Sequence, residues 1–486
     1  MDNKKQGLRF SQCKSHYKNE NDDDRPRRGK ERLCLKLGAL ALTAMFLTGT
    51  AGHVLAQTAG APLPLIPAER LREDITVLGD SLVRLHPGIY RYQNKVAIDK
   101  AFDSCRRAID HPMSVPEFFK HIDHLIGQLE DGHTECFMPA DANQWLKNNA
   151  GLFPAGLWLS GRHAYLLCSA MNFDAGTEIL DVNGTPMSKI VNDMLGELSS
   201  DGTNLTGKYD KINRGHDPFP YLYFVLNGSQ DTFRISYRTP GGIAGTTTIP
   251  SKRFSGVECI PSMPQPSKYL TLEYKPDGVA VLTIRTLLNE YLDRTGEKFR
   301  DFLFNSFKDI GEKHVSKLVI DVRGNGGGED TNGSLLFSYL TDRPFRYYVR
   351  LDKTTGPYFE HPNLAIQQPN AEHFDGKVYI LINGGTFSST AEFAAIAKSN
   401  NRGLLIGEET GGGYYGNTSG DRVTIYLPNS KIRVNIPLTR YTLAVKHLKH
   451  GERGVIPDVE IHPTIGDKLS GKDIQMEDAL QLAGNQ

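Results

Sequence analysis

The sequence predicts a protein of the α/β class (mixed α+β) with three structural regions. Apolar residues recur at helical spacing from Ala68 to about Leu129. Short β-patterned segments broken by glycines follow, between about residues 151 and 265. From Ser267 onwards, strand patterns alternate with helix patterns. These changes of pattern place an amino-terminal helical domain at 68–148, a β-rich domain at 149–265 and an alternating α/β domain at 266–486.

Length and charge limit the classes of function. A chain of 486 residues is long enough for two or three domains. The formal charge is zero, but residues 1–56 contain 11 Lys/Arg and 6 Asp/Glu. The remainder therefore has 45 basic and 50 acidic residues, a net charge of −5. A mildly acidic chain has no electrostatic basis for binding nucleic acid or an anionic membrane, so no nucleic-acid partner is expected.

Residues 1–56 have the features of a signal peptide with a long basic segment. Residues 37–56 contain no charged side chain and are mostly apolar, and Val54-Leu55-Ala56 offers a cleavage site before Gln57. We expect export to a periplasmic or extracellular compartment, a linker at 57–67 and no stable membrane insertion after leader removal. The alternative is an uncleaved membrane anchor formed by residues 37–56. The long basic segment also leaves open a true start downstream of Met1.

Four cysteines follow the leader: Cys105, Cys136, Cys168 and Cys259. An even number in an exported protein permits two disulfides, although the spacing does not define the pairing. No close Cys-x-x-Cys pair is present, so no zinc site is expected.

A histidine follows the last helix of the amino-terminal region. The segment VPEFFKHIDHLIGQLEDGH predicts an amphipathic helix that ends at Asp131-Gly132. His133 and Thr134 come directly after this end. A side chain at that position is held by the helix without being buried in its packing, which suits a functional residue.

The β-rich region contains one recognisable strand–turn–helix unit. Glu178–Val182 reads as a strand, Asn183-Gly184 as a turn and Met187–Leu195 as a helix. This unit resembles the corresponding part of a PDZ domain, a module that binds peptide termini by adding a strand to its sheet edge. The alternative is a β-rich spacer without a ligand.

The stretch Val378–Glu392 combines a buried strand with a helix that starts at a serine. The apolar run VYILI predicts the strand, Asn383-Gly384-Gly385 ends it, and Ser388 or Ser389 caps the next helix. A serine at such a turn exposes its hydroxyl beside backbone N–H groups that can stabilise an oxyanion. The alternative is that these residues only cap the helix.

Two further segments, Lys317–Gly328 and Arg402–Gly413, also read as a strand that runs into a glycine-rich loop. With the stretch Val378–Glu392, the domain has three turns at which a strand runs into a glycine-rich loop, and we call these turns glycine corners. Three glycine corners in one α/β domain predict a site at the carboxyl ends of the strands. The loop Gly324–Gly328 lacks the Lys-Ser/Thr of a P-loop and the spacing of a dinucleotide-binding fingerprint. Its glycines are better suited to bringing backbone N–H groups to a substrate carbonyl, or simply to forming a tight turn.

The segments LVIDVRGNGGG, INGGTFSSTAEFAA and LLIGEETGGG, in this order, resemble the C-terminal processing (tail-specific) and tricorn-type serine peptidases. The resemblance implies a crotonase-like ββα spiral core, a protein or peptide substrate, and no metal or organic cofactor. The family's nucleophile is the serine three residues before the glutamate of a Ser-x-x-Glu segment. That serine is Ser389, before Glu392, with Ser388 as the adjacent alternative.

The family divides over the base that activates this serine. One branch uses a lysine in the late glycine corner, where this sequence has Tyr414 at the expected position and no lysine. The tricorn-like branch uses a histidine from the amino-terminal region, and Asp131-Gly132-His133-Thr134 resembles its motif. The resemblance therefore implies His133 as the base. His447 and His450 are the next candidates.

The rest of the site is also implied by the resemblance. Glu452 is the candidate for the third catalytic group, although it lies one position from the expected register and can equally be a surface glutamate. The oxyanion hole would combine the N–H of Thr390 with that of Gly327 or Gly326. Asp321 and Arg323 are expected to brace the glycine loop.

We therefore expect an exported serine endopeptidase that acts through an acyl-enzyme, with the PDZ-like segment binding or gating the substrate. Oligomerisation is compatible with the sequence. One alternative is a catalytically silent peptide- or lipid-binding protein on the same fold. Another is an acyl-CoA enzyme of the crotonase type, which would not need the serine at the helix start.

Overall fold

The computed structural model describes residues 63–261, 265–449 and 451–484. The predicted leader at 1–56 lies outside these ranges, as does the linker up to residue 62. Within the described ranges, every helix is too short or too polar to cross a lipid bilayer.

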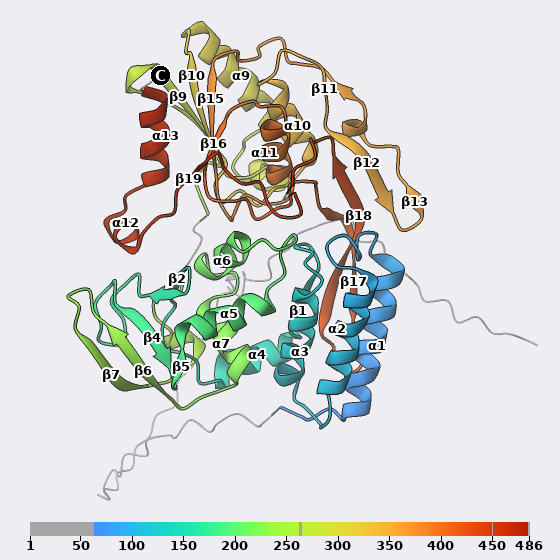
Figure 1. The fold of residues 1–486 in the computed structure, drawn as a ribbon, viewed down its shortest axis with the longest axis vertical. Coiled ribbons are helices and arrows are strands. Elements are labelled where there is room, and N and C mark those ends of the chain that lie inside the picture. Colours follow the sequence, from blue (N-terminus) through green and yellow to red (C-terminus); the bar gives the residue numbers. More distant parts are fainter. Residues whose placement is uncertain (1–62, 262–264, 450, 485–486) are drawn as a thin grey trace, which may run out of the picture. The chain divides into compact units, whose positions relative to one another are not determined.

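The amino-terminal region consists of helices, as predicted (Figure 1). The apolar face of its first helix, with Leu71, Ile75 and Leu78, is buried, which is the pattern that the helical spacing predicts. A short strand follows the third helix and leads into the fourth. The elements are α1 (Ala68–Leu85), α2 (Lys95–Ala108), α3 (Val115–Gly127), β1 (Glu135–Phe137) and α4 (Ala140–Asn149).

The second region is a sheet in the order β2-β3-β4-β6-β7, with β5 paired to β4. Its strand–turn–helix unit is confirmed: Asn183 and Gly184 both have positive φ between β4 and β5. Two helices, α6 and α7, were not anticipated in this β-rich segment. The elements are β2 (Trp158–Ser160), β3 (His163–Tyr165), β4 (Glu178–Val182), β5 (Thr185–Pro186), α5 (Met187–Glu197), α6 (Thr206–Asn213), α7 (Phe219–Asn227), β6 (Thr232–Arg238) and β7 (Ala244–Pro250).

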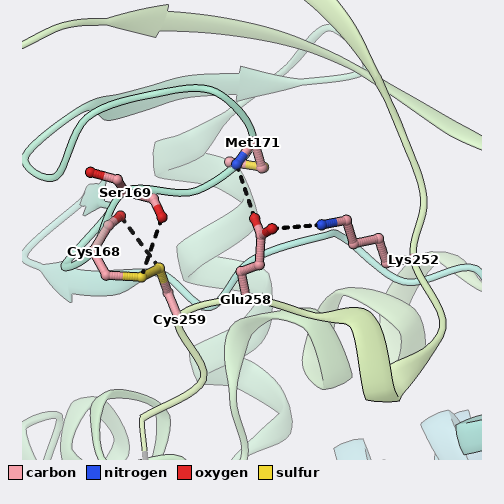
Figure 2. Close-up of a disulfide and its surroundings, with 6 residues drawn as sticks. All are labelled: Cys168, Ser169, Met171, Lys252, Glu258 and Cys259. Carbon is pink, nitrogen blue, oxygen red and sulfur yellow. Dashed lines mark hydrogen bonds and ion pairs between the residues drawn. A yellow bond between two sulfur atoms is a disulfide. The ribbon is translucent and has the colours of Figure 1, made fainter.

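One disulfide, between Cys168 and Cys259, joins the loop after β3 to the segment after β7 (Figure 2). Beside it, Glu258 accepts hydrogen bonds from the backbone N–H of Met171 at 3.0 Å and from Lys252 Nζ at 2.7 Å. The other two cysteines that follow the leader are free thiols, so the second disulfide that the count permits does not form.

The third region is built on a six-stranded sheet in the order β19-β16-β15-β10-β9-β8. All neighbours pair in parallel except β8 with β9. The elements of this sheet and its helices are β8 (Leu270–Lys275), β9 (Val279–Ile284), α8 (Asn289–Arg294), α9 (Phe299–Glu312), β10 (Lys317–Asp321), α10 (Asp330–Ser338), β15 (Lys377–Ile382), α11 (Ser389–Ser399), β16 (Leu404–Gly407), β19 (Val459–Glu460), α12 (Ile465–Ser470) and α13 (Ile474–Gly484).

Alternate residues of the central strands enter two separate apolar cores. Ile320 and Ile380 pack with α9, α10 and α11 on one face of the sheet. Val319 and Leu381 pack against α13 on the other face (Figure 1). Because both faces are covered, the carboxyl ends of the strands remain the place where loops can form a site.

The segment DRVTIYLPNSKIRVNIPLT predicts a hairpin around Pro428-Asn429, and the structure confirms it. The hairpin packs outside the sheet that precedes it in the sequence. Its strands β17 (Thr418–Tyr426) and β18 (Arg433–Leu443) pair with each other, and β18 also pairs with β1. Val434 and Ile436 lie in the core of the amino-terminal helices. The remaining strands are β11 (Phe345–Arg346), β12 (Tyr348–Lys353), β13 (Gly356–Pro357) and β14 (Ile366–Gln367).

Candidate functional site

Ser388 lies at the turn between β15 and α11, with a backbone conformation that is rare for a residue with a side chain. Its φ is 51° and its ψ is −133°. Such a conformation typically costs about 1–3 kcal/mol and persists only where the surroundings enforce it. The helix starts at the next residue, and the N–H of Glu392 donates to the Ser388 carbonyl at 3.0 Å. The turn therefore presents the Ser388 side chain at the amino-terminal end of α11.

His133 meets this serine from the amino-terminal region. Its Nε2 lies 3.2 Å from Ser388 Oγ, and its ring stacks on Phe387 with a centroid distance of 4.5 Å. For Ser388 to donate its hydroxyl proton, Nε2 must be the unprotonated nitrogen. Burial lowers the pKa of His133 below its ordinary value, which favours this neutral form. The two residues therefore form a hydroxyl–imidazole pair of the kind that activates a nucleophile.

The structure places Ser388, the adjacent alternative to the predicted Ser389, next to His133. Ser389 is 2% exposed, and its hydroxyl donates to the carbonyl of Gly328 at 3.0 Å. It is the first residue of α11. The family's spacing to the glutamate selects Ser389. The positive φ at Ser388 instead brings the Ser388 side chain close to the imidazole of His133.

Two of the three predicted oxyanion donors, the N–H groups of Thr390 and Gly327, already have acceptors in the structure. The N–H of Thr390 donates to the Phe387 carbonyl at 3.1 Å, so it is used inside the first turn. The N–H of Gly327 donates to Asn325 Oδ1 at 3.0 Å. No acceptor within the described ranges takes the N–H of Ser389 or that of Gly326.

The glycine loop nevertheless lies against the serine. A Cβ on Gly327 would come within 2.7 Å of the Ser388 Cβ and 3.2 Å of the Ser389 nitrogen, and its φ of +104° also favours glycine. Asp321 and Arg323 brace this loop, because Arg323 Nε donates to Asp321 Oδ1 at 2.9 Å.

A network behind His133 holds the turn in place. Asp131 Oδ1 accepts from the backbone N–H groups of His133 and Thr134, both at 3.1 Å. Its Oδ2 lies 3.5 Å from Nε2 of His86, whose Nδ1 accepts the N–H of Gly88. Burial opposes ionisation of Asp131, but the imidazoles of His86 and His133 lower its pKa to about 2. This histidine–aspartate pair was not predicted, because nothing in the local sequence links His86 to the Asp131 turn.

Glu452 does not reach His133. It is exposed, and no hydrogen bond or ion pair joins it to the imidazole in the described part of the chain. His133 Nδ1 is buried, and no described residue forms a hydrogen bond with it. Tyr414, at the position of the alternative lysine, is buried and donates to the Lys446 carbonyl. The described residues also contain no group of three His, Cys, Asp or Glu side chains arranged to hold a metal ion.

Glu392, on the helix that begins after Ser388, is held in its protonated form. The Tyr348 hydroxyl lies 2.6 Å from Glu392 Oε2 and 2.9 Å from Asp330 Oδ2. One hydroxyl proton serves only one of these oxygens, so a second proton must be present. Asp330 Oδ2 is also 3.1 Å from His361 Nε2. Burial raises the pKa of Glu392 to about 8, so the second proton resides on Glu392 at neutral pH.

Because Glu392 has a raised pKa, we predict that the free energy of unfolding depends on pH. In the unfolded chain Glu392 loses its proton near its ordinary pKa, whereas the folded protein keeps it to about pH 8. The folded state then binds more protons between these limits, so the free energy of unfolding should fall by up to ~1.4 kcal/mol per pH unit as pH rises. Glu392→Gln mimics the neutral acid and should remove this slope. Urea unfolding at pH 5, 6.5 and 8 measures it.

The control is Glu312→Gln, which changes an exposed carboxylate near Lys308. It should leave the slope unchanged. Equal slopes in wild type and Glu392→Gln would show that Glu392 is already ionised in the folded protein.

Comparison with known proteins finds a family match for part of the chain. Residues 278–461 match the family model of Peptidase family S41. The chain is 28% identical over 193 residues to the tricorn protease homolog of Saccharolobus solfataricus, covering 38% of this chain and 16% of that protein. It is 25% identical over 160 residues to the chloroplastic C-terminal processing peptidase of Tetradesmus obliquus, covering 33% of this chain and 32% of that protein.

The fold matches the crystal structure of mature CPAF with a TM-score of 0.60 and 14% identity, covering 86% of this chain and 97% of that chain. The described fold is thus shared with CPAF along most of its length. Residues 278–461 thus match peptidase family S41, a family of serine-type peptidases, as the three segments predicted. The chain spans less than a third of the length of the two curated relatives described above.

Proposed function

We propose that this protein is an exported serine endopeptidase that hydrolyses peptide bonds through an acyl-enzyme on Ser388. The observation that carries the proposal is the 3.2 Å contact between Ser388 Oγ and His133 Nε2 at the start of α11. The crotonase-like spiral core implied by the resemblance is consistent with three glycine corners at one end of the parallel sheet. The disulfide between Cys168 and Cys259 supports export, because such bonds persist in oxidising compartments.

In the proposed reaction, His133 Nε2 takes the hydroxyl proton of Ser388 while Ser388 Oγ bonds to the substrate carbonyl carbon. The carbonyl oxygen becomes an oxyanion, stabilised by the Ser389 N–H and the glycine loop at Gly326–Gly328. The C–N bond then breaks, and His133 gives its proton to the leaving amine. A water molecule, deprotonated by His133, hydrolyses the ester and restores the Ser388 hydroxyl.

The test is cleavage of an unfolded protein by the chain without residues 1–56, beside its Ser388→Ala variant. New amino termini should appear with wild type only. Equal cleavage by both variants would rule out Ser388 as the nucleophile. A folded but inactive wild type would favour the silent binding protein.

We also propose that residues 149–265 form a PDZ-like module that gates access to the site. Its edge strand β2 is already occupied by α6: the Asn213 side-chain amide accepts from the Leu159 N–H at 2.7 Å and donates to the Leu159 carbonyl at 2.9 Å. These are the backbone groups that an added peptide strand would use. At its ends, α6 contacts two glycine corners, through Thr206 to the Glu409 carbonyl at 2.9 Å and Arg214 to the Gly324 carbonyl at 3.0 Å.

Asn213→Ala should therefore open the β2 edge to peptides. We expect a labelled peptide with a free, apolar carboxyl terminus to bind the variant at least about tenfold more tightly than wild type, measured by fluorescence anisotropy. Asn227→Ala removes a comparable amide, which bonds within α7 to the Tyr223 carbonyl, and should not change binding. Equal affinity of wild type and Asn213→Ala would contradict a gate formed by α6.

A further inference from the structure

A buried carboxylate that the sequence did not single out lies directly behind His133. Asp201, in the segment between α5 and α6, is 0% exposed. Its Oδ1 accepts the N–H of Gly132 at 2.9 Å, and its Oδ2 accepts the N–H of Gly413 at 3.0 Å. Burial raises the pKa of Asp201 above its ordinary value, whereas the two N–H donors act in the opposite direction and favour the carboxylate.

The two hydrogen bonds connect separate parts of the site. Gly132 directly precedes His133, and Gly413 belongs to the late glycine corner, beside Tyr92. A Cβ on Gly132 would come within 2.9 Å of the Phe387 ring and 3.0 Å of Asp201 Oδ1. The His133 turn is thus held between Asp201 and the residue that precedes Ser388.

Asp201 is also the charge that most favours protonation of His133. Burial lowers the pKa of His133, and among the neighbouring groups Asp201 opposes this most strongly, followed by Asp131. Lys211 and Arg422 act in the opposite direction. Asp131 is already paired with His86 at 3.5 Å.

The reaction needs such a charge. When His133 accepts the Ser388 proton, a positive charge forms in a buried place where solvent screens little, and a fixed carboxylate lowers its energy. Glu452, the acid implied by the family resemblance, is exposed and forms no hydrogen bond or ion pair with the imidazole among the described residues.

We propose that Asp201 is the positioning residue of this site, which fixes the His133 turn and stabilises the imidazolium that forms during acylation. This inference rests on the proposed function. Asp201 acts through His133 and has no contact with the substrate.

The test is the pH profile of kcat/KM for wild type, Asp201→Asn and Glu452→Gln, each in the mature chain. Asp201→Asn removes a negative charge, so protonated His133 is less stable and its pKa falls. The acid limb of the profile should move to lower pH, and the plateau should fall by about 100-fold or more, as for other triad carboxylates. A purely structural role would lower the plateau without moving the limb.

Glu452→Gln is the matched control and should keep both the limb and the plateau of wild type. If Asp201→Asn folds and its acid limb stays at the wild-type pH, the inference on Asp201 is wrong. The proposed function still stands in that case, provided that wild type is active and Ser388→Ala is inactive. If thermal scans show that Asp201→Asn does not fold, Glu452→Gln decides. If Glu452→Gln moves the limb and lowers the plateau, then Glu452 stabilises the imidazolium. If its pH profile is that of wild type, the result supports Asp201.

Discussion

Replacing Ser388 with alanine should reduce kcat/KM for peptide-bond cleavage by at least about 10³-fold, without unfolding the protein. The hydroxyl is the group that would form the acyl-enzyme, and removing a nucleophile of this type typically costs several orders of magnitude. Alanine keeps the Cβ and relieves none of the backbone strain at φ 51°, so the turn should be retained. Initial rates on an unfolded protein substrate, together with a thermal unfolding scan, measure the two quantities.

The neighbouring serine supplies the control. Ser389→Ala removes a hydroxyl that donates to the Gly328 carbonyl, and a buried hydrogen bond of this kind contributes about 1 kcal/mol. We expect a modest loss of stability and an activity within about tenfold of wild type. If Ser389→Ala were inactive and Ser388→Ala active, the register of the family motif would be correct and the geometry at this turn would be wrong.

A fluorophosphonate probe separates the two serines in a second way. It reacts with a serine whose hydroxyl is activated by a base, and fragmentation mass spectrometry locates the adduct. The adduct should lie on Ser388, and His133→Ala should suppress labelling because the hydroxyl loses its base. A label on Ser389 in the wild-type chain would contradict the 3.2 Å pairing as the reactive one.

The sequence was sufficient to predict most of the sheet and the position of His133, the proposed base. Apolar strands such as Val378–Ile382 are identifiable because burial on both faces demands a continuous hydrophobic run. The His133 position was also accessible, since a helix end at Asp131-Gly132 is a local signal.

Features that depend on distant partners could not be predicted. The hairpin of β17 and β18 was identified locally, but its packing on the amino-terminal helices depends on pairing between β1 and β18. The choice between Ser388 and Ser389 depends on a single φ, and both residues are common at helix starts. Asp201 has no motif: its role follows from two backbone N–H groups contributed by segments far apart in the sequence.

His133→Ala should be nearly as damaging as Ser388→Ala, with a loss of about 10³-fold or more, because the two side chains would act as one unit. Burial lowers the pKa of His133, so wild-type kcat/KM should rise with pH and reach its plateau through a limb centred below 6.5. The direction of this pH dependence follows from the proposed role of His133 as a base. Only the neutral imidazole accepts the Ser388 proton, and a lower pKa keeps the imidazole neutral to lower pH. Rates between pH 4.5 and 8 locate the limb.

The control for this second variant is His447→Ala, which removes an imidazole from the late loop, where it packs 5.9 Å from the Tyr415 ring. It should retain full activity and the wild-type limb, whereas the residual rate of His133→Ala should lack the limb. A limb that persists in His133→Ala and disappears in His447→Ala would assign the base to the late loop. The 3.2 Å contact at Ser388 would then be a structural hydrogen bond, and the nucleophile would need a different activating group.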